Sequence, residues 1–279
     1  MKILLLKYDN TDNIGDVVQT LAVAQHIQKH DGFIERDHMN SYDGEECIVV
    51  MNGWFSHEPQ NWPPSPKITP IFFGFHMTSQ AAAFYSEHKE YFRRFQPIGC
   101  RDLGTAEIIR GWGVEAYVSG CATMTFSERP EAPANPKVVL VDVPRQHFDR
   151  GERANFVYES HIMPAHWSHL SQDAKIDTAK ALLELYRSEA GTVVTSRIHC
   201  AMPCFAMGIP TVYSGIVEYR TALINDIGIP SYAFSKFRRM KVKALPFRAP
   251  SYKERKQAIA ADLRKRLELA GVPLAPWRP

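Results

Sequence analysis

The sequence contains no apolar run close to the roughly 20 residues that a membrane-spanning helix needs. The apolar start of the chain, Ile3 to Leu6, is too short for a secretory signal peptide and is followed directly by Lys7. We therefore expect no integral membrane segment and a soluble, cytoplasmic protein. An excess of one charge is also missing, because 33 Lys and Arg face 30 Asp and Glu, a net charge of +3. This small charge is not typical of a nucleic-acid-binding protein, so no nucleic acid is expected as a partner.

Cysteine is scarce too, and its five positions exclude two kinds of site. An odd number of scattered cysteines is not a disulfide framework, and no Cys-X-X-Cys pair exists to make a zinc site. The densest histidine cluster, His161, His166 and His169, has no carboxylate or cysteine at ligand spacing. We therefore expect buried free thiols and no metal centre.

The chain does have the composition of a globular protein, since 45% of its 279 residues are apolar and 23% are charged. Short apolar runs typical of buried parallel strands alternate with segments of helical periodicity. In the first half we expect strands over 3–7, 48–51, 71–75, 98–101 and 114–118, and helices over 17–29, 87–95 and 105–112. Residues 53–70 are rich in Pro, Trp and Asn, which predicts a long functional loop.

A segment rich in proline and polar residues, 127–136, is typical of an interdomain linker. After it we expect strands over 138–143, 156–159, 193–195 and 211–213, and helices over 172–190, 198–207, 217–227 and 251–270. Two successive series of strands and helices predict an α/β protein with two Rossmann-like halves. The predicted domains are 1–126 and 137–279, the second of which includes the terminal helix.

Candidate ligand-binding residues follow the predicted strands, at the edge where open parallel sheets bind their ligands. A glycine in the first turn lets backbone N–H groups approach a ligand, and the helix that follows favours an anion at its start. Arg197 and His199 lie in the first turn of a helix between apolar strands, a poor place for a cation unless an anion meets it. The candidates are Asn13, Gly15, Asp16, Asn52, Gly53, Trp54, His76, Arg101, Asp102, Ser196, Arg197 and His199.

Structural explanations stay open for several of these residues. Residues 13–16 could form only a strand-to-helix turn, with Asp16 near the helix start. Arg101 and Asp102 could be an ion pair that caps the next helix. His199 could simply hydrogen-bond the neighbouring strand. The whole set favours a function more strongly than any one member does.

The same residues carry a family resemblance. Asn13-Ile-Gly-Asp16, Asn52-Gly-Trp54, Gly99-Cys-Arg-Asp102, Ser119-Gly-Cys121, and Ser196-Arg-Ile-His199 with Gly208-Ile-Pro210 occur in this order. Over about residues 9–215, the chain resembles the polysaccharide pyruvyl transferase family. The resemblance implies a two-domain, GT-B-like fold with the active site in the interdomain cleft. It also implies transfer of a pyruvyl group from phosphoenolpyruvate to two hydroxyls of a carbohydrate acceptor, which forms a ketal and releases phosphate.

Roles for individual residues follow from this resemblance and from the chemistry of the donor. In the family an Arg–apolar–His element binds the donor and takes part in catalysis, and it matches residues 197–199; the Arg of an Arg-Asp element matches Arg101. Phosphoenolpyruvate carries a carboxylate and a phosphate, which two arginines can bind bidentately. His199 would supply a proton, and Asp16 or Asp102 would take one from the acceptor hydroxyl. The reaction requires no cofactor and no metal.

Two alternative functions stay open. A GT-B-type glycosyltransferase that uses a nucleotide sugar would share the fold and the basic residues, but it needs a carboxylate for the ribose and an apolar slot for the base. A non-catalytic relative would bind a sugar or an anion with the same fold. The sequence also leaves open the acceptor sugar, whether the acceptor is lipid-linked, and the oligomeric state.

Overall fold

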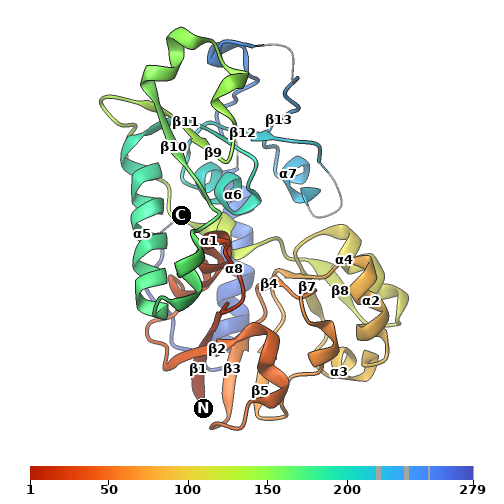
Figure 1. Ribbon diagram of the computed structural model, residues 1–279. Helices are drawn as coiled ribbons and strands as arrows, with labels where there is room; N and C mark the ends of the chain where they lie inside the picture. Colours follow the sequence, from red (N-terminus) through yellow and green to blue (C-terminus); the bar gives the residue numbers. More distant parts are fainter. Residues whose placement is uncertain (218–220, 236–238, 251, 279) are drawn as a thin grey trace. The chain divides into compact units, whose positions relative to one another are not determined.

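The computed structural model describes residues 1–217, 221–235, 239–250 and 252–278 (Figure 1). Contacts between Cα atoms group the chain into two compact units. The first unit consists of Met1–Asn10, Gln19–Thr125 and Gln257–Arg278, and the second of Thr11–Val18 and Phe126–Lys256. The chain passes from the first unit to the second after Thr125, next to the segment 127–136 that was expected to be a linker. Two segments, Thr11–Val18 and Gln257–Arg278, group with the unit formed by the opposite half of the sequence.

The first unit contains two small sheets in which every strand pairing is parallel. One sheet has the order β2-β1-β3-β5 and consists of β1 (Lys2–Lys7), β2 (Gly32–Glu35), β3 (Cys47–Val50) and β5 (Ile68–Ile71). The other has the order β4-β6-β7-β8 and consists of β4 (Gly53–Trp54), β6 (Phe75–His76), β7 (Ile98–Cys100) and β8 (Ala116–Val118). Strand β3 is buried along its whole length, as parallel strands covered on both faces are.

Short helices connect these strands. Helix α1 (Ile14–Ala24) follows β1, α2 (Ser79–Ser86) and α3 (Lys89–Arg94) lie between β6 and β7, and α4 (Leu103–Gly111) joins β7 to β8. Three 3-10 turns complete the first half of the chain: η1 (Arg36–Ser41), η2 (Pro59–Asn61) and η3 (Ala122–Thr125). Helix α1 begins in the second unit and ends in the first.

An aromatic cluster fills the core of the first unit. The ring of Trp62 stacks on Phe92 with centroids 5.2 Å apart and meets Tyr85 edge-on at 5.0 Å. Phe72 and Phe75 pack against the same rings and are fully buried. Such aromatic pairs add specific attraction to the large apolar area that they bury. The segment 53–70, expected as a loop, therefore supplies a core residue as well as β4, η2 and the start of β5.

Five parallel strands form the sheet of the second unit. They are β9 (Lys137–Val141), β10 (Phe156–Glu159), β11 (Ala190–Thr195), β12 (Thr211–Ser214) and β13 (Ser231–Tyr232). Their spatial order is β10-β9-β11-β12-β13, so the strands of this unit follow the order 2-1-3-4-5. In sheets of this order the chain connections diverge between strands 1 and 3, and ligands bind at the carboxyl ends there. In this unit the divergence lies between β9 and β11.

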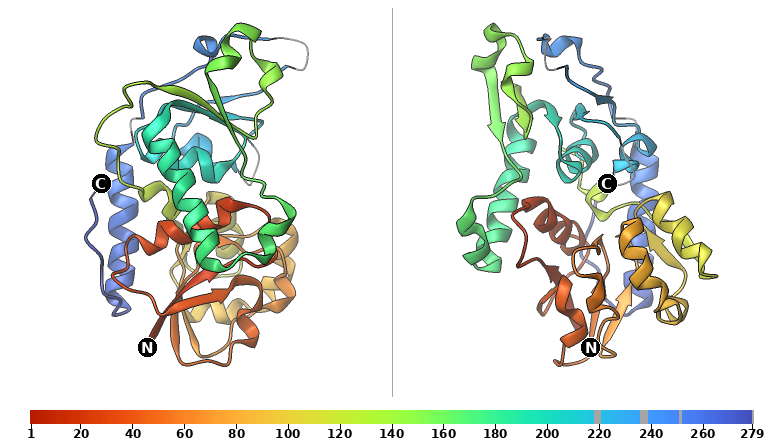
Figure 2. Two further views of the ribbon diagram at one scale, coloured as in Figure 1. Left: turned by 60° about the vertical axis from the view of Figure 1, so that its left-hand side comes forward. Right: turned by 45° about the vertical axis from the view of Figure 1, so that its right-hand side comes forward.

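Two helices cover this sheet. Helix α5 (Gln172–Glu189) packs against β11, and α6 (Ile198–Ala206) packs against β11 and β12. Figure 2 shows α5 from two further sides as a single unbroken helix. The Ser171 hydroxyl caps its first turn by accepting a hydrogen bond from the N–H of Ala174 at 3.2 Å. The remaining elements of the second half of the described chain are η4 (Arg145–His147), η5 (Arg150–Asn155), η6 (Ala165–His169), α7 (Leu223–Asp226), η8 (Val242–Ala244) and α8 (Lys253–Leu269). Most of α8 belongs to the first unit.

The predicted α/β class with parallel strands is confirmed, but some elements differ from expectation. The sequence predicts one strand over 71–75, whereas β5 ends at Ile71 and β6 begins in the other sheet, because Gly74 turns the chain with a φ of +70°. Strand β2 and helix α2 are not predicted at all. Helix α1 covers 14–24 instead of 17–29, and of the helix predicted over 217–227 the structure has α7, while residues 218–220 lie outside the described residues.

All five cysteines are buried free thiols, as their scatter predicts. Burial, more than any neighbouring group, raises the pKa of the Cys121 thiol and so keeps it protonated. In the described part of the chain no helix has both the length and the apolar character needed to cross a bilayer.

Candidate active site

Arg197 and Asp142 form an ion pair at the carboxyl ends of β11 and β9. Asp142 directly follows β9, and Arg197 stands immediately before α6. The Nε of Arg197 donates to Oδ2 of Asp142 at 2.6 Å, and the two side chains are 30% and 15% exposed. The pair lies where the connections of the sheet diverge, which is where such sheets bind ligands. Among the described residues the guanidinium makes no other hydrogen bond through its side chain, so its terminal NH₂ groups are available to an anion.

Asp142 also organises the backbone around this ion pair. Its carboxylate accepts hydrogen bonds from the Ser160 hydroxyl at 2.6 Å and the His161 N–H at 3.0 Å, and its carbonyl accepts one from the Ser196 hydroxyl at 3.0 Å. Burial alone would raise the pKa of Asp142, but the hydrogen bonds from Ser160 and His161 and the ion pair with Arg197 hold it below its ordinary value. Asp142 is the one non-glycine of the described chain with a positive φ, +52°, a conformation that Asp and Asn tolerate best.

The turn that begins α1 is joined to the residues that follow β10. The N–H of Ile14 donates to the carbonyl of His161 at 3.0 Å, and Oδ1 of Asn13 accepts the N–H of Gly15 at 3.0 Å. A Cβ atom at Gly15 would lie 3.0 Å from Cβ of His199 and 3.3 Å from Nδ1 of His161. Gly15 therefore allows the turn to approach two histidines closely. Its N–H, which the sequence predicts to face a ligand, is used by Asn13 because that side chain closes the turn.

His199 and Asp16, two of the expected catalytic groups, lie in the interior of the second unit. His199 stands in the first turn of α6, is 6% exposed and packs beside Gly15. Asp16 is 7% exposed and accepts a hydrogen bond from the Thr11 hydroxyl at 3.0 Å. The catalytic roles of both residues stay predictions.

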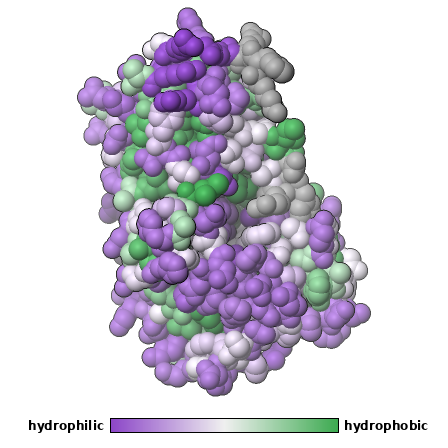
Figure 3. All heavy atoms as spheres, viewed as in Figure 1, coloured by the Kyte–Doolittle hydropathy of each residue, from purple (hydrophilic) through white to green (hydrophobic). Residues whose placement is uncertain are grey.

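A pocket of about 460 Å³ lies beside the Arg197–Asp142 ion pair. Ser196 and Glu159 add polar groups to its wall, and most of the remaining lining is apolar. On the face seen in Figure 3, apolar surface interrupts the hydrophilic surface of the second unit. Concave, mostly apolar surfaces with a few placed polar groups are the usual form of ligand sites. This pocket therefore has the character of a binding site, although His199 is not among the residues that line it.

In the first unit, His76, Arg101 and Asp102 form a buried group. Nδ1 of His76 lies 2.6 Å from Oδ2 of Asp102, and Nε of Arg101 lies 3.6 Å from the same oxygen; the three side chains are 0%, 3% and 2% exposed. The N–H of Thr105 donates to Oδ1 of Asp102 at 2.9 Å, which makes Asp102 the N-cap of α4. Burial opposes the charge of Asp102, but its three neighbours hold its pKa below the ordinary value. These contacts support the ion-pair and cap explanation for Asp102.

Asn52 is buried as well and fixes a turn of the first unit. It is 1% exposed, and its Oδ1 accepts the N–H of Ala122 at 3.1 Å at the start of η3. A Cβ atom at Gly74 would lie 2.2 Å from the same oxygen, so glycine is needed there for this approach. Gly53 and Trp54 form β4, and of these two only Trp54 is partly exposed. A ligand contact by Asn52 or Gly53 stays a prediction.

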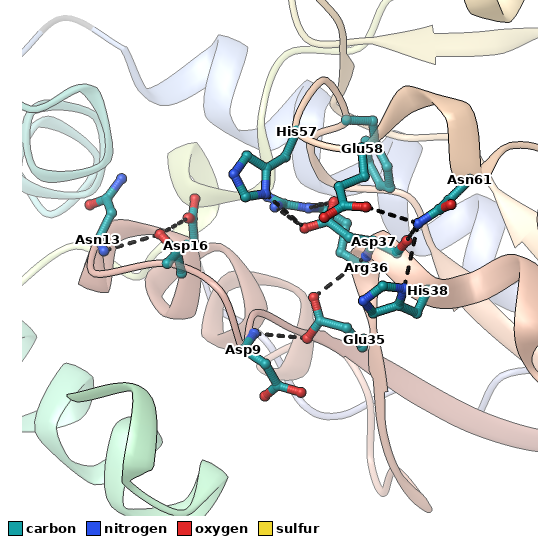
Figure 4. Close-up of polar contacts among 12 residues, drawn as sticks. Asp9, Asn13, Asp16, Glu35, Arg36, Asp37, His38, His57, Glu58 and Asn61 are labelled. Carbon is teal, nitrogen blue, oxygen red and sulfur yellow. Dashed lines mark hydrogen bonds and ion pairs between the residues drawn. The ribbon is translucent and has the colours of Figure 1, made fainter. Parts of the chain in front are cut away.

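A charged cluster at the carboxyl ends of β1 and β2 was not predicted from the sequence (Figure 4). Arg36 donates two hydrogen bonds to Asp37, at 2.8 and 2.6 Å, and Nδ1 of His57 lies 3.3 Å from the same carboxylate. Glu35 accepts the N–H of Asp9 at 2.8 Å. Burial raises the pKa of Glu35 to about 7, and the charges of Asp9 and Asp37 contribute to the shift. The cluster could not be predicted from the sequence because its members come from three separate segments of the chain.

We expect Glu35→Gln to gain stability relative to the natural chain as the pH rises from 5 to 8. With a folded-state pKa of about 7 against an ordinary 4.5, Glu35 favours folding below about pH 4.5 and loses this contribution as the pH rises through 7. Because the side chain is partly exposed, the change should be about 1 kcal/mol. Urea unfolding of both proteins at the two pH values measures it. An equal difference at both would show that the carboxyl titrates normally.

The structure thus gathers the predicted residues in two places. Asn13, Gly15, Asp16, Ser196, Arg197 and His199 belong to the second unit, and Asn52, Gly53, Trp54, His76, Arg101 and Asp102 belong to the first. Sequence analysis did not single out Asp142 and Glu159. Both stand at the carboxyl end of a predicted strand, which is the signal that could have found them.

Comparisons with known proteins extend over most of the chain. Residues 13–215 match a family described as polysaccharide pyruvyl transferase. Among solved structures, the chain is similar to a functionally uncharacterized protein from Klebsiella pneumoniae subsp. pneumoniae NTUH-K2044, with 12% identity and a TM-score of 0.48 over 81% of this chain and 88% of that one. No curated protein sequence matches the chain. The family match includes every candidate site residue from Asn13 to His199.

Proposed function

Because the chain belongs to the polysaccharide pyruvyl transferase family, we propose that it transfers the pyruvyl group of phosphoenolpyruvate to two hydroxyls of a carbohydrate acceptor. The products are a cyclic ketal and inorganic phosphate. The proposal includes a GT-B-like arrangement of the two units with the active site in their cleft, and a cytoplasmic location. It assigns no role to a cofactor or a metal.

The observation that carries this proposal is the Arg197 guanidinium, held by Asp142 at a pocket beside the start of α6. A planar guanidinium matches the carboxylate and the phosphate of the donor, and Asp142 fixes its orientation through Nε. The start of α6 adds a favourable field for the same anion. Arg101 of the first unit is the second cation for the donor in this proposal.

His199 is the proton donor of the proposed reaction. It stands two residues after Arg197, so the first turn of α6 carries both side chains. Protonation of the methylene carbon of phosphoenolpyruvate leaves an electron-poor carbon that an acceptor hydroxyl can attack. An imidazole is suited to this transfer because it exchanges protons near neutral pH.

We expect His199→Ala to lower kcat by a factor of about 10² or more while the affinity for the donor stays within a few-fold of the natural value. The substitution removes the acid but keeps Arg197 and its ion pair. Steady-state phosphate release gives kcat, calorimetric titration gives donor affinity, and thermal unfolding confirms that the variant folds. Turnover of the variant close to the parent rate would remove His199 from the reaction.

Phosphate release from phosphoenolpyruvate, measured with methyl glucoside, methyl galactoside and methyl mannoside, tests the proposed function. We expect release that depends on an acceptor, and a pyruvyl ketal product in the mass spectrum. Phosphoenolpyruvate should also raise the melting temperature of the natural chain, because a ligand that binds the folded state stabilises it. Stabilisation by a nucleotide sugar instead, without phosphate release, would favour the glycosyltransferase. No response to either ligand would favour a non-catalytic relative.

A further inference from the structure

The positive charge of the chain is concentrated in two segments of the second unit. Residues 145–153 and 239–248 together contain seven Lys and Arg but only two acidic residues, an excess of five positive charges. The whole chain has an excess of three, so the rest of it is net negative. Such an uneven distribution attracts an oppositely charged partner to one face of a protein. The exposed members of the two segments form what we call the basic surface: Arg145, Arg150, Arg239, Lys241, Lys243 and Arg248.

The two segments that carry the basic surface lie side by side. The N–H of Met240 donates to the carbonyl of His147 at 3.0 Å, and the N–H of Asp149 donates to the carbonyl of Met240 at 3.1 Å. Oε2 of Glu152 accepts the N–H of Val242 at 3.1 Å. All views in Figures 1 and 2 show η4, η5 and η8 at the same end of the second unit. The six cations therefore belong to one continuous part of this unit.

Apolar residues fix the second segment to the protein and leave its cations in solvent. Arg239, Lys241 and Lys243 are exposed, whereas Met240 and Val242 between them are half-buried and pack against the core of the second unit. In Figure 3 the surface at this end of the unit is hydrophilic. This alternation presents three positive charges within a stretch of five residues.

The cations of the basic surface are not used inside the protein. Among the described residues, none of the six forms an ion pair with a carboxylate or donates a hydrogen bond through its side chain. Arg153, the seventh basic residue of the two segments, instead donates two hydrogen bonds to the carbonyl of Phe148 and is partly buried. The six exposed charges are therefore available to an anionic partner.

The surroundings of these charges favour a lipid surface over a protein or a nucleic acid. The core of a protein interface is apolar and poor in lysine, and none of the large apolar side chains that are exposed in the described chain lies in the two segments. Single-stranded nucleic acids stack their bases on exposed aromatic rings. Here Phe148 is fully buried, and the ring of Phe234 stacks on His147 with centroids 4.8 Å apart. An anionic lipid surface requires only accumulated positive charge.

We propose that the basic surface docks the protein on a membrane that contains anionic lipids. The contact is peripheral and reversible, because Lys and Arg side chains meet the phosphates of the lipid headgroups without apolar insertion. This inference does not depend on the proposed function, since the basic surface contains none of the candidate site residues.

Co-sedimentation of the full-length protein with vesicles tests the docking. We compare vesicles of phosphatidylcholine alone with vesicles of phosphatidylcholine and phosphatidylglycerol in equal amounts. The protein should sediment with the mixed vesicles and stay in solution with phosphatidylcholine, and its binding should weaken as salt is added, because salt screens exposed charges. Equal retention by the two kinds of vesicle, or retention by neither, would overturn the proposal.

The triple variant Arg239→Gln, Lys241→Gln and Lys243→Gln removes half of the basic surface. We expect its partitioning onto the mixed vesicles to fall by about 10²-fold, because each Lys or Arg near an anionic surface contributes about fivefold. All three side chains are exposed, so the variant should fold and keep its melting temperature. A folded variant that binds as tightly as the natural chain contradicts the proposal.

A second triple variant, Lys29→Gln, Lys89→Gln and Lys265→Gln, is the matched control. These lysines are exposed and belong to the first unit, so their replacement lowers the net charge equally but spares the basic surface. Partitioning should stay within a few-fold of the natural value. A loss as large as that of the first triple variant would show that net charge alone drives the binding.

The first segment has a test of its own. Replacing Arg145 and Arg150 together by glutamine should lower partitioning by about 25-fold, the product of two single contributions. Natural binding by this double variant would refute the idea that the two segments act as one surface.

Two further probes distinguish the membrane from other anionic partners. If a double-stranded oligonucleotide or polyglutamate binds the protein at a salt concentration at which the mixed vesicles do not, the surface belongs to a nucleic acid or an acidic protein and the proposal is wrong. None of the binding measurements uses phosphoenolpyruvate. Failure of the proposed function would therefore leave this inference standing, and failure of the docking would leave phosphate release with the methyl glycosides unchanged.

Discussion

Arg197→Ala lowers kcat/KM for phosphoenolpyruvate by about 10³-fold or more, and Arg197→Lys recovers only a small part of the loss. The guanidinium is the positive group at the pocket, and about 4 kcal/mol of binding corresponds to a thousandfold change. Lysine keeps the charge but cannot hold Asp142 with one N–H and a bidentate anion with the others. Phosphate release at varied donor concentration measures both variants.

Two companion variants show whether the loss comes from the site. Arg187→Ala is the matched control, because Arg187 is 31% exposed, close to the 30% of Arg197, and pairs with Glu184 on α5 away from the pocket. It should leave the donor KM unchanged. Asp142→Asn keeps a residue that tolerates positive φ but removes the charge that holds Arg197, and we expect a loss of about tenfold. An unchanged donor affinity in both Arg197 variants would remove this arginine from the site.

Asp102→Ala lowers the free energy of unfolding by about 3–5 kcal/mol. The carboxylate is the buried partner of His76 and Arg101, and removing it takes a negative charge away from two buried groups that carry or accept positive charge. The variant also loses the cap at the start of α4, since an alanine side chain cannot accept the N–H of Thr105 as Oδ1 of Asp102 does. Urea unfolding measures the loss, and Asp173→Ala in the first turn of α5, an exposed helix start, should cost less than about 1 kcal/mol.

Asp102→Asn separates the structural role of this residue from the catalytic one. The amide oxygen can still accept the N–H of Thr105, so α4 keeps its cap while the charge is lost. A structural role predicts reduced stability and near-normal turnover of the folded fraction. Normal stability with a loss of kcat of about 10² would instead make Asp102 a base in the reaction.

Elements with long periodic patterns could be predicted from the sequence, and short ones could not. Helix α5 has eighteen residues with a serine cap, and its apolar positions repeat with helical spacing. Strand β2 has four residues, of which only Phe33 and Ile34 are large and apolar, too few to show a period. The residues around Phe72 form one continuous hydrophobic segment, so the break at Gly74, where the chain passes to another sheet, could not be predicted from hydrophobicity.

In the candidate site too, residues in one short segment could be predicted, whereas contacts between residues far apart in the sequence could not. The segment Ser196 to His199 stands out in the sequence because a cation and an imidazole open an otherwise apolar helix. Asp142 does not stand out in the sequence, since its role depends on the ion pair with Arg197, which lies 55 residues further along the chain. Burial is equally hidden from sequence analysis. Asp102 and Asp16 were reasonable bases by type, and only the fold shows how little of each is exposed.

The interleaving of the two units along the chain restricts how this gene can recombine. A crossover at residue 126 between two parents would take most of the second unit from one and its segment Thr11–Val18 from the other. That segment bonds through Ile14 to the carbonyl of His161, and through the carbonyl of Asp12 to the N–H of Met163. A hybrid would therefore join foreign surfaces at the turn beside His199. An exchange of the second unit therefore has to carry the segment Thr11–Val18 together with Phe126–Lys256.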